Sequence, residues 1–119
     1  MNVFIVEDDN VLLLMLERMV ARMGFNVVGT AQSGADAIRE INKTTPDLIL
    51  LDIILKDHID GVTVAESISS NYASSIIYIT GNSDQVNRQR AKKIGYHDYL
   101  IKPASYQELK SSIEKLISV

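Results

Sequence analysis

Short apolar runs alternate with longer amphipathic stretches five times along this chain of 119 residues. The apolar runs predict strands over residues 2–6, 26–30, 47–52, 75–80 and 97–101. The stretches that follow them predict helices over residues 10–23, 34–43, 62–70, 84–94 and 105–117. Strands that alternate with helices favour right-handed βαβ units, with helices on both faces of a parallel sheet. We therefore expect a doubly wound α/β fold with a five-stranded parallel sheet.

The strength of each apolar run predicts the order of the strands. Residues 48–51 are apolar at every position, as in a strand buried on both faces, and residues 3–6 follow the same pattern. Residues 26–30 include Asn26, Gly29 and Thr30, which suit the edge of a sheet. The order 2-1-3-4-5 satisfies these patterns and places the change in winding direction between the first and third strands.

Polar side chains follow four of the predicted strands. Glu7 and Asp8 follow the first strand, Asp52 the third, Thr80 the fourth and Lys102 the fifth. The carboxyl ends of parallel strands share one edge of the sheet, and ligands bind in the crevice outside that edge. Three carboxylates, a hydroxyl and an ammonium should therefore meet in one small site.

Each of these residues also has a simpler interpretation. Asp8 and Asp9 precede a helix and could cap it, and Asp52 could be a solvated acid at a strand end. Thr80 suits a strand for its β-propensity alone, and Lys102 precedes a proline in a connection. The joint position of the acids weakens these interpretations, because crowded like charges raise one another's pKa. A hard divalent cation, Mg²⁺ (or Mn²⁺), removes that cost and takes carboxylate and phosphate oxygens as ligands.

Asp52 is the best placed of the acids to react, since it lies between the switch-point acids and the fourth strand. Carboxylates are nucleophiles toward phosphoryl groups. Transfer depends on positioning and on neutralising the phosphoryl oxygens. Mg²⁺ would cover one oxygen, Lys102 a second, and the Thr80 hydroxyl or backbone N–H groups a third. The pattern thus favours phosphoryl chemistry on a carboxylate.

Composition narrows the class of protein further. The length suits a single domain over residues 1–119, and a net charge of -3 gives no sign of a nucleic-acid or anionic-membrane surface. The chain lacks cysteine, which excludes disulfides and suits a reducing compartment. The apolar stretch at residues 11–16 is too short to span a bilayer, and the first residues show no signal-peptide pattern. We expect a soluble, cytoplasmic protein.

No glycine-rich phosphate loop follows the first strand, which disfavours nucleotide- and flavin-binding modules.

Five segments with a characteristic spacing carry a resemblance to a known family. They are residues 4–9 (FIVEDD), 46–52 (PDLILLD), 60–61 (DG), 79–81 (ITG) and 95–103 (GYHDYLIKP). With these segments the chain resembles the receiver domain of two-component response regulators, the CheY-like domains, over essentially its full length. The resemblance implies a flavodoxin-like (βα)5 fold and a role in phosphorelay signal transduction.

The resemblance implies an acceptor and a metal site. Asp52 matches the phospho-acceptor, and Glu7 and Asp8 match the metal-binding acid pair. Asp52 itself and the backbone carbonyl of Ile54 would complete the protein ligands of the metal, Mg²⁺ or Mn²⁺.

The resemblance also implies a switch and its partners. Thr80 and Lys102 match the residues that contact the bound phosphoryl group, and Tyr99 matches the aromatic switch position. A histidine kinase or phosphotransfer protein would donate the phosphoryl group, and the first helix would dock it. The chain would catalyse only its own phosphorylation and slow dephosphorylation, so it would not be an enzyme in the usual sense.

The output side is less specified. The strongly polar fourth helix is either a solvated face or an output face beside Tyr99. The fourth helix, fifth strand and fifth helix could form a homodimer, and an output partner or effector domain would read the switch. We expect no direct nucleic-acid contact from this domain and no membrane contact.

Three departures from the family pattern leave alternatives open. Lys56 occupies a position where the family usually has proline, the loop from Asp52 to Asp60 is one residue longer, and Gly81 replaces the usual Ala or Ser. One alternative is a degenerate receiver that binds partners without being phosphorylated. Another is an aspartyl-phosphate hydrolase, which would want a second Asp where this chain has Ile54.

Overall fold

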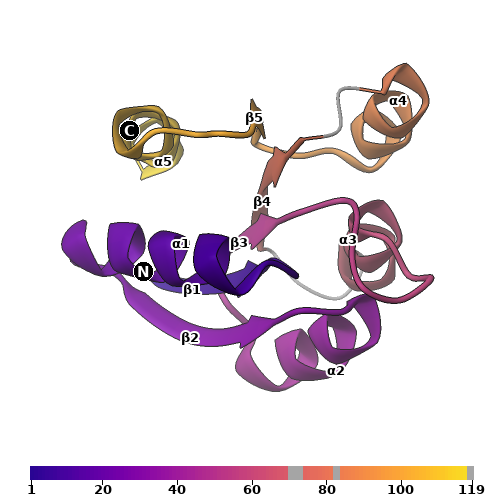
Figure 1. Ribbon diagram of the computed structural model, residues 1–119, viewed down its shortest axis with the longest axis horizontal. Coiled ribbons are helices and arrows are strands. Elements are labelled where there is room, and N and C mark those ends of the chain that lie inside the picture. Colours follow the sequence, from indigo (N-terminus) through magenta and orange to yellow (C-terminus); the bar gives the residue numbers. More distant parts are fainter. Residues whose placement is uncertain (70–73, 82–83, 118–119) are drawn as a thin grey trace.

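The computed structural model describes residues 1–69, 74–81 and 84–117, and it contains one five-stranded sheet. The strands are β1 (Asn2–Val6), β2 (Asn26–Ala31), β3 (Leu48–Leu51), β4 (Ser75–Thr80) and β5 (Asp98–Ile101). The helices are α1 (Asn10–Arg22), α2 (Gly34–Thr44), α3 (Gly61–Ser69), α4 (Gln85–Ile94) and α5 (Tyr106–Ile117). Helices α1 and α5 cover one face of the sheet, and α2, α3 and α4 cover the other (Figure 1). Within the described ranges no helix has the length and apolar character needed to cross a membrane.

The strands pair in the order β2-β1-β3-β4-β5, and every pairing is parallel. This confirms the predicted doubly wound, flavodoxin-like α/β fold, with β1 and β3 as central neighbours and β2 at an edge. Each predicted bound lies within one residue of the observed one. The predicted third helix ended at residue 70, which lies outside the described residues.

Alternate residues of the central strands serve two separate cores. In β1, Phe4 and Val6 pack toward α2, α3 and α4, whereas Val3 and Ile5 pack toward α1 and α5. All four residues of β3 are buried as well. A strand that is anchored on both faces cannot rotate, so the residues that follow it are held in fixed positions.

Side-chain caps begin four of the helices close to the ends of the strands that precede them. Asp9 accepts hydrogen bonds from the amides of Val11 and Leu12 at 2.9 and 3.0 Å, so the capping role at α1 belongs to Asp9. Three later helices are capped in the same way: Ser33 caps α2, Asp84 caps α4, and Ser105 caps α5, where Ser105 and Glu108 bond reciprocally.

The start of α3 touches the backbone of the predicted acceptor. The Gly61 amide donates to the Ile53 carbonyl at 2.7 Å. A Cβ atom at residue 61 would lie 2.0 Å from the carbonyl oxygen of Asp52. Backbone cannot yield at such a distance, so only glycine allows α3 to start against Asp52.

We expect Gly61→Ala to destabilise the protein by about 2–3 kcal/mol, because the added methyl group overpacks a backbone contact. The free energy of unfolding from urea denaturation would measure the loss. Gly81→Ala is the matched control, since a Cβ there would meet no atom within 4 Å. An equal loss in both variants would contradict the assignment of a steric role to Gly61.

Candidate functional site

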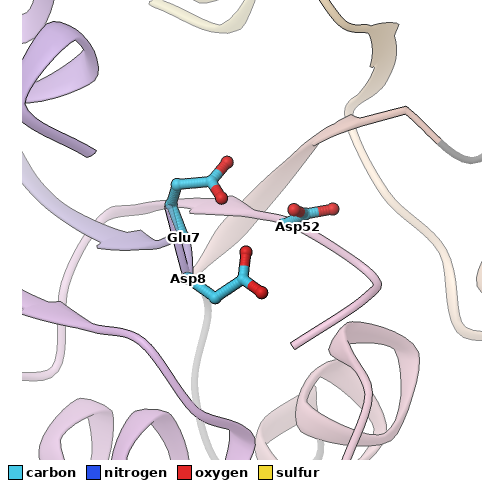
Figure 2. A group of neighbouring side chains, drawn as sticks. All are labelled: Glu7, Asp8 and Asp52. Atoms are coloured by element: carbon cyan, nitrogen blue, oxygen red, sulfur yellow. The ribbon is translucent and has the colours of Figure 1, made fainter. Parts of the chain in front are cut away.

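Three carboxylates meet at the carboxyl ends of the two central strands. Glu7 and Asp8 follow β1, and Asp52 follows β3. The backbone amide of Asp52 donates to the Val6 carbonyl at 3.0 Å, so the ends of the two strands are joined. One oxygen from each of the three side chains lies within 4.8 Å of the others. Figure 2 shows the three carboxylates directed toward a common space between the strand ends.

Because these acids are buried, keeping all three charged at such short distances costs free energy. Glu7 is 1% exposed and Asp52 is 5% exposed, while Asp8 is partly buried. Charged carboxylates cannot be solvated at such positions and repel one another. A set of three carboxylate oxygens, without nitrogen or sulfur, is the donor set that Mg²⁺ and Mn²⁺ prefer. The residues therefore fit a hard divalent cation.

Lys102 supplies the cationic side chain that contacts this cluster. Its Nζ donates to Asp52 Oδ2 at 2.7 Å and lies 2.7 Å from Glu7 Oε1. Burial alone would lower the pKa of Lys102, but the two carboxylates outweigh it and raise the pKa above its usual value. Lys102 therefore stays charged, and its single ammonium contacts two of the three carboxylates.

The surroundings of Glu7 disfavour its charged form. Burial, together with the charge of Asp52, raises its pKa, and the Lys102 ammonium and the Asp9 amide only partly offset this. The Asp9 amide donates to Glu7 Oε2 at 3.0 Å. The other oxygen, Oε1, is buried and makes no hydrogen bond among the described residues, since its contact with Lys102 is an ion pair of poor hydrogen-bond geometry. A bound cation would satisfy the remaining negative charge of the cluster.

The predicted phosphoryl-contacting residues line one open depression of about 350 Å³. Its lining residues are Asp8, Asp52, Ile54, Thr80, Gly81 and Lys102. Thr80 is fully buried at the end of β4, and the Ile53 amide holds Asp52 Oδ1 at 2.7 Å. Asp8, Asp52, Gly81 and Lys102 each follow a different strand, so this edge of the sheet brings together residues that lie far apart in the sequence. A group the size of phosphate fits within this volume.

Tyr99 does not line the depression. It lies on β5, is 7% exposed, and packs against Tyr78 and Tyr96 with ring centroids 5.5 and 5.7 Å apart. The Arg88 guanidinium of α4 covers its ring at 4.6 Å. Burial raises the pKa of the Tyr78 hydroxyl, which has no hydrogen-bond partner among the described residues. The predicted switch residue thus belongs to a buried aromatic cluster directly beneath α4.

Sequence reasoning missed the ion pair that joins α3 to α4. Arg90 donates to both carboxylate oxygens of Asp60, at 2.8 and 3.4 Å, and Asp60 Oδ1 also caps α3 by accepting from the Thr63 amide at 2.9 Å. Burial raises the pKa of Asp60, but Arg90 and Thr63 outweigh it and lower the pKa overall. In the sequence, Asp60 stood out only as part of the Asp60–Gly61 motif, and Arg90 was one of several charged residues of the polar fourth helix. Neither pattern indicates that the two side chains pair.

Comparison with known proteins assigns the family. The model of the response regulator receiver domain matches residues 3–114. The chain therefore belongs to the response regulator receiver domains. Membership is consistent with phosphorylation-dependent signalling, and domains of this family interact with kinases and output domains and typically bind Mg²⁺ at an acidic pocket.

The relatives agree with this assignment. Transcriptional regulatory protein PdtaR of Mycobacterium tuberculosis is 31% identical over 117 residues, which cover 98% of this chain and 57% of PdtaR. TorCAD operon transcriptional regulatory protein TorR of Escherichia coli O157:H7 is 36% identical over 117 residues, covering 98% of this chain and 50% of TorR. The chain thus spans about half the length of these curated relatives.

A solved structure shows the same architecture. The signal receiver domain of a modulated diguanylate cyclase from Desulfovibrio desulfuricans G20 superposes with a TM-score of 0.90 at 34% identity. The alignment covers 98% of this chain and 92% of that chain. The receiver fold therefore extends over nearly all of the chain.

We expect Asp8→Asn to stabilise the protein by about 1–2 kcal/mol when Mg²⁺ is chelated, because it removes one of three crowded like charges. Excess MgCl₂ should then stabilise the unsubstituted protein more than the variant, since a ligand that binds the folded state stabilises it. Urea denaturation with EDTA and with MgCl₂ measures both effects. Glu114→Gln, an exposed substitution of equal charge on α5, is the control. A variant that is less stable in EDTA would contradict the repulsion.

We expect Arg90→Gln to cost about 0.5–1 kcal/mol at neutral pH, since Arg90 and Asp60 are both partly exposed. The folded-state pKa of Asp60 is lowered, so its stabilising contribution is present above the ordinary pKa and is lost as the pH falls through the folded value. Urea denaturation from pH 7 to about pH 3 should show the two proteins converging in acid. Arg39→Gln, in an exposed pair with Asp36, should change little at either pH. A loss that persists unchanged in acid would point to packing instead of charge.

Proposed function

We propose that this chain is a phosphorylation-activated signalling switch in which Asp52 accepts a phosphoryl group from a histidine kinase or phosphotransfer protein. The observation that carries the proposal is the state of Asp52. Its carboxylate is 5% exposed, the Ile53 amide holds one oxygen, Lys102 holds the other, and the side chain lines the open depression. A carboxylate fixed in this way is preorganised for attack on a phosphorus atom.

In the proposed step, an Asp52 oxygen forms a bond to phosphorus while the P–N bond to the donor histidine breaks. The donor imidazole leaves with the electron pair of that bond and takes up one proton from solvent, which makes it neutral. No oxidation or reduction occurs. Lys102 then pairs with one phosphoryl oxygen, and the Thr80 hydroxyl donates to another, which spreads the charge of the transferred group.

The divalent cation would be held by Glu7, Asp8, Asp52 and the backbone carbonyl of Ile54. When bound, Mg²⁺ or Mn²⁺ neutralises charge on the phosphoryl oxygens. The chain supplies the rest: it orients Asp52, keeps Glu7 away from water and places Lys102 opposite the acids. It would act only on itself, through its own phosphorylation and slow dephosphorylation.

Phosphorylation would reach the surface through β4 and β5. The acyl phosphate adds about one unit of negative charge beyond that of the free carboxylate. Thr80 ends β4 and pairs in register with Ile101, while Tyr99 pairs with Tyr78 on the same two strands. A shift of Thr80 toward the phosphoryl group would therefore be followed by Tyr99, and Arg88 would carry the change to α4. In this view the phosphoryl group shifts a population between two arrangements of the α4–β5–α5 surface.

The phosphodonor would dock beside α1. Val11 is 68% exposed, and Leu14 and Met15 are about half exposed, so the start of α1 presents apolar side chains next to the acids. A small apolar pocket adjoins them between α1 and the loop after β5; it is lined by Glu7, Leu12, Met15, Leu16, Met19, Ile79, Lys102, Pro103 and Ala104. Helices of a kinase or phosphotransfer protein could place a phosphohistidine at the depression from this side.

The output would go to an effector domain or a separate partner, since this chain spans about half of its transcription-regulating relatives. We propose that the α4–β5–α5 surface makes that contact or a homodimer. Any nucleic-acid contact would then belong to the effector, and the site of action would be the cytoplasm, without membrane contact.

The proposal predicts that incubation with Mg²⁺ and acetyl phosphate adds one phosphoryl group, which intact-mass spectrometry would detect. The adduct should disappear with EDTA and in Asp52→Asn. Asp47→Asn is the matched control, because Asp47 is exposed and lies just before the amino end of the same strand. Absence of an adduct in the unsubstituted protein would favour a degenerate receiver, and continuous phosphate release over many turnovers would favour a hydrolase.

A further inference from the structure

The loop from β3 to α3 contains the extra residue and the Lys56 substitution, and it is docked on a neighbouring helix. Its residue Asp57 reaches the first turn of α2, where Asp57 Oδ1 accepts from the Gly34 amide at 2.8 Å and Oδ2 accepts from the Ala35 amide at 3.0 Å. These amides are among the donors that a helix leaves without an internal partner at its N-terminus. The two hydrogen bonds lower the pKa of Asp57, so the carboxylate is charged at neutral pH.

Contacts on both sides of Asp57 strengthen the attachment. A Cβ at residue 34 would lie 2.3 Å from the Ile59 carbonyl oxygen, so Gly34 is in direct contact with the second half of the loop. Lys56 Nζ donates to Gln32 Oε1 at 3.1 Å, and Gln32 in turn donates to Asn10 at the start of α1. The loop is therefore fastened by Lys56, Asp57 and Ile59 to Gln32 and to the first turn of α2.

The first half of the same loop carries a proposed metal ligand. Ile54 precedes Asp57 by three residues and lines the depression together with Asp8 and Asp52. Its sequence neighbours Ile53 and Leu55 are buried, whereas the Ile54 side chain is 55% exposed. Asp60, at the far end, is held by Arg90 and by the first turn of α3. Between Leu55 and Asp60, the bonds from Asp57 and its neighbours restrict the path of the loop.

We propose that Asp57 is a positioning residue for the divalent metal, although it is not one of the metal ligands. By binding the loop to α2, it sets where the Ile54 carbonyl lies relative to Asp8 and Asp52. Without this attachment, metal binding would have to order the loop and would lose affinity by the entropy of doing so. The inference rests on the metal site of the proposed function. A residue that only caps α2 would affect stability and leave metal affinity unchanged.

Isothermal titration with MgCl₂ tests this proposal. Asp57→Ala should weaken Mg²⁺ binding on the order of tenfold, as the loss of outer contacts to a metal site typically does, and Asp57→Asn, which keeps one acceptor oxygen, should fall between. Asp36→Ala is the matched control: it removes the same charge from the first turn of α2, where Asp36 is exposed and pairs with Arg39. Thermal unfolding of each variant with EDTA gives the effect on stability separately.

Equal Mg²⁺ affinities in Asp57→Ala and Asp36→Ala would overturn the positioning role and leave the proposed function intact. Absence of Mg²⁺ binding by the unsubstituted protein would overturn the proposed metal site itself. Should Asp57→Ala fail to fold, hydrogen exchange in the unsubstituted protein decides, because coupling is reciprocal. Mg²⁺ should then slow exchange of the Gly34 and Ala35 amides severalfold, and unchanged exchange at both amides would refute the proposal.

Discussion

The carboxylates of Glu7, Asp8 and Asp52 are held together by the most deeply buried strands of the sheet. β1 and β3 are anchored by packing on both faces, and the Asp52 amide bonds to the Val6 carbonyl at 3.0 Å, so the acids cannot separate without breaking the sheet. The stability of the core thus maintains a repulsion that Lys102 offsets only in part. Because the three carboxylates repel one another in the free protein, a bound cation would stabilise the site strongly, and so would an anionic group that pairs with the Lys102 ammonium.

Two sets of contacts lead from this site to α4, and they start from opposite sides of Asp52. On one side, Gly61 rests on the Asp52 carbonyl, and the first turn of α3 is tied to α4 through Asp60 and Arg90. On the other side, β4 leads from Thr80 to the aromatic cluster around Tyr99, which Arg88 covers. Both arginines lie on the same helix, so α4 is held at two points by elements next to Asp52, the proposed acceptor. A displacement at either point would therefore act on the same helix.

The fold and the proximity of the three acids could be predicted from the sequence, because both follow from the periodicity of apolar residues. The apolar runs at residues 3–6 and 48–51 identify the central strands, and parallel topology then requires Glu7 and Asp52 to be neighbours. Other features were out of reach because they depend on side-chain pairings between distant segments. Asp57 bonds to amides 22 and 23 residues away, and Arg90 bonds to an acid 30 residues away. No local pattern distinguishes Asp57 from any polar loop residue, and the aromatic packing of Tyr99 depends on the register of β4 and β5.

The aromatic cluster has a practical consequence for spectroscopy. The chain has no tryptophan and five tyrosines, and three of these, Tyr78, Tyr96 and Tyr99, contact one another beneath α4. Near-ultraviolet absorption, circular dichroism and intrinsic emission therefore come largely from rings that lie between the acidic pocket and the outer surface of α4. These three rings therefore form an unlabelled optical probe on one of the two sets of contacts that join the acidic pocket to α4.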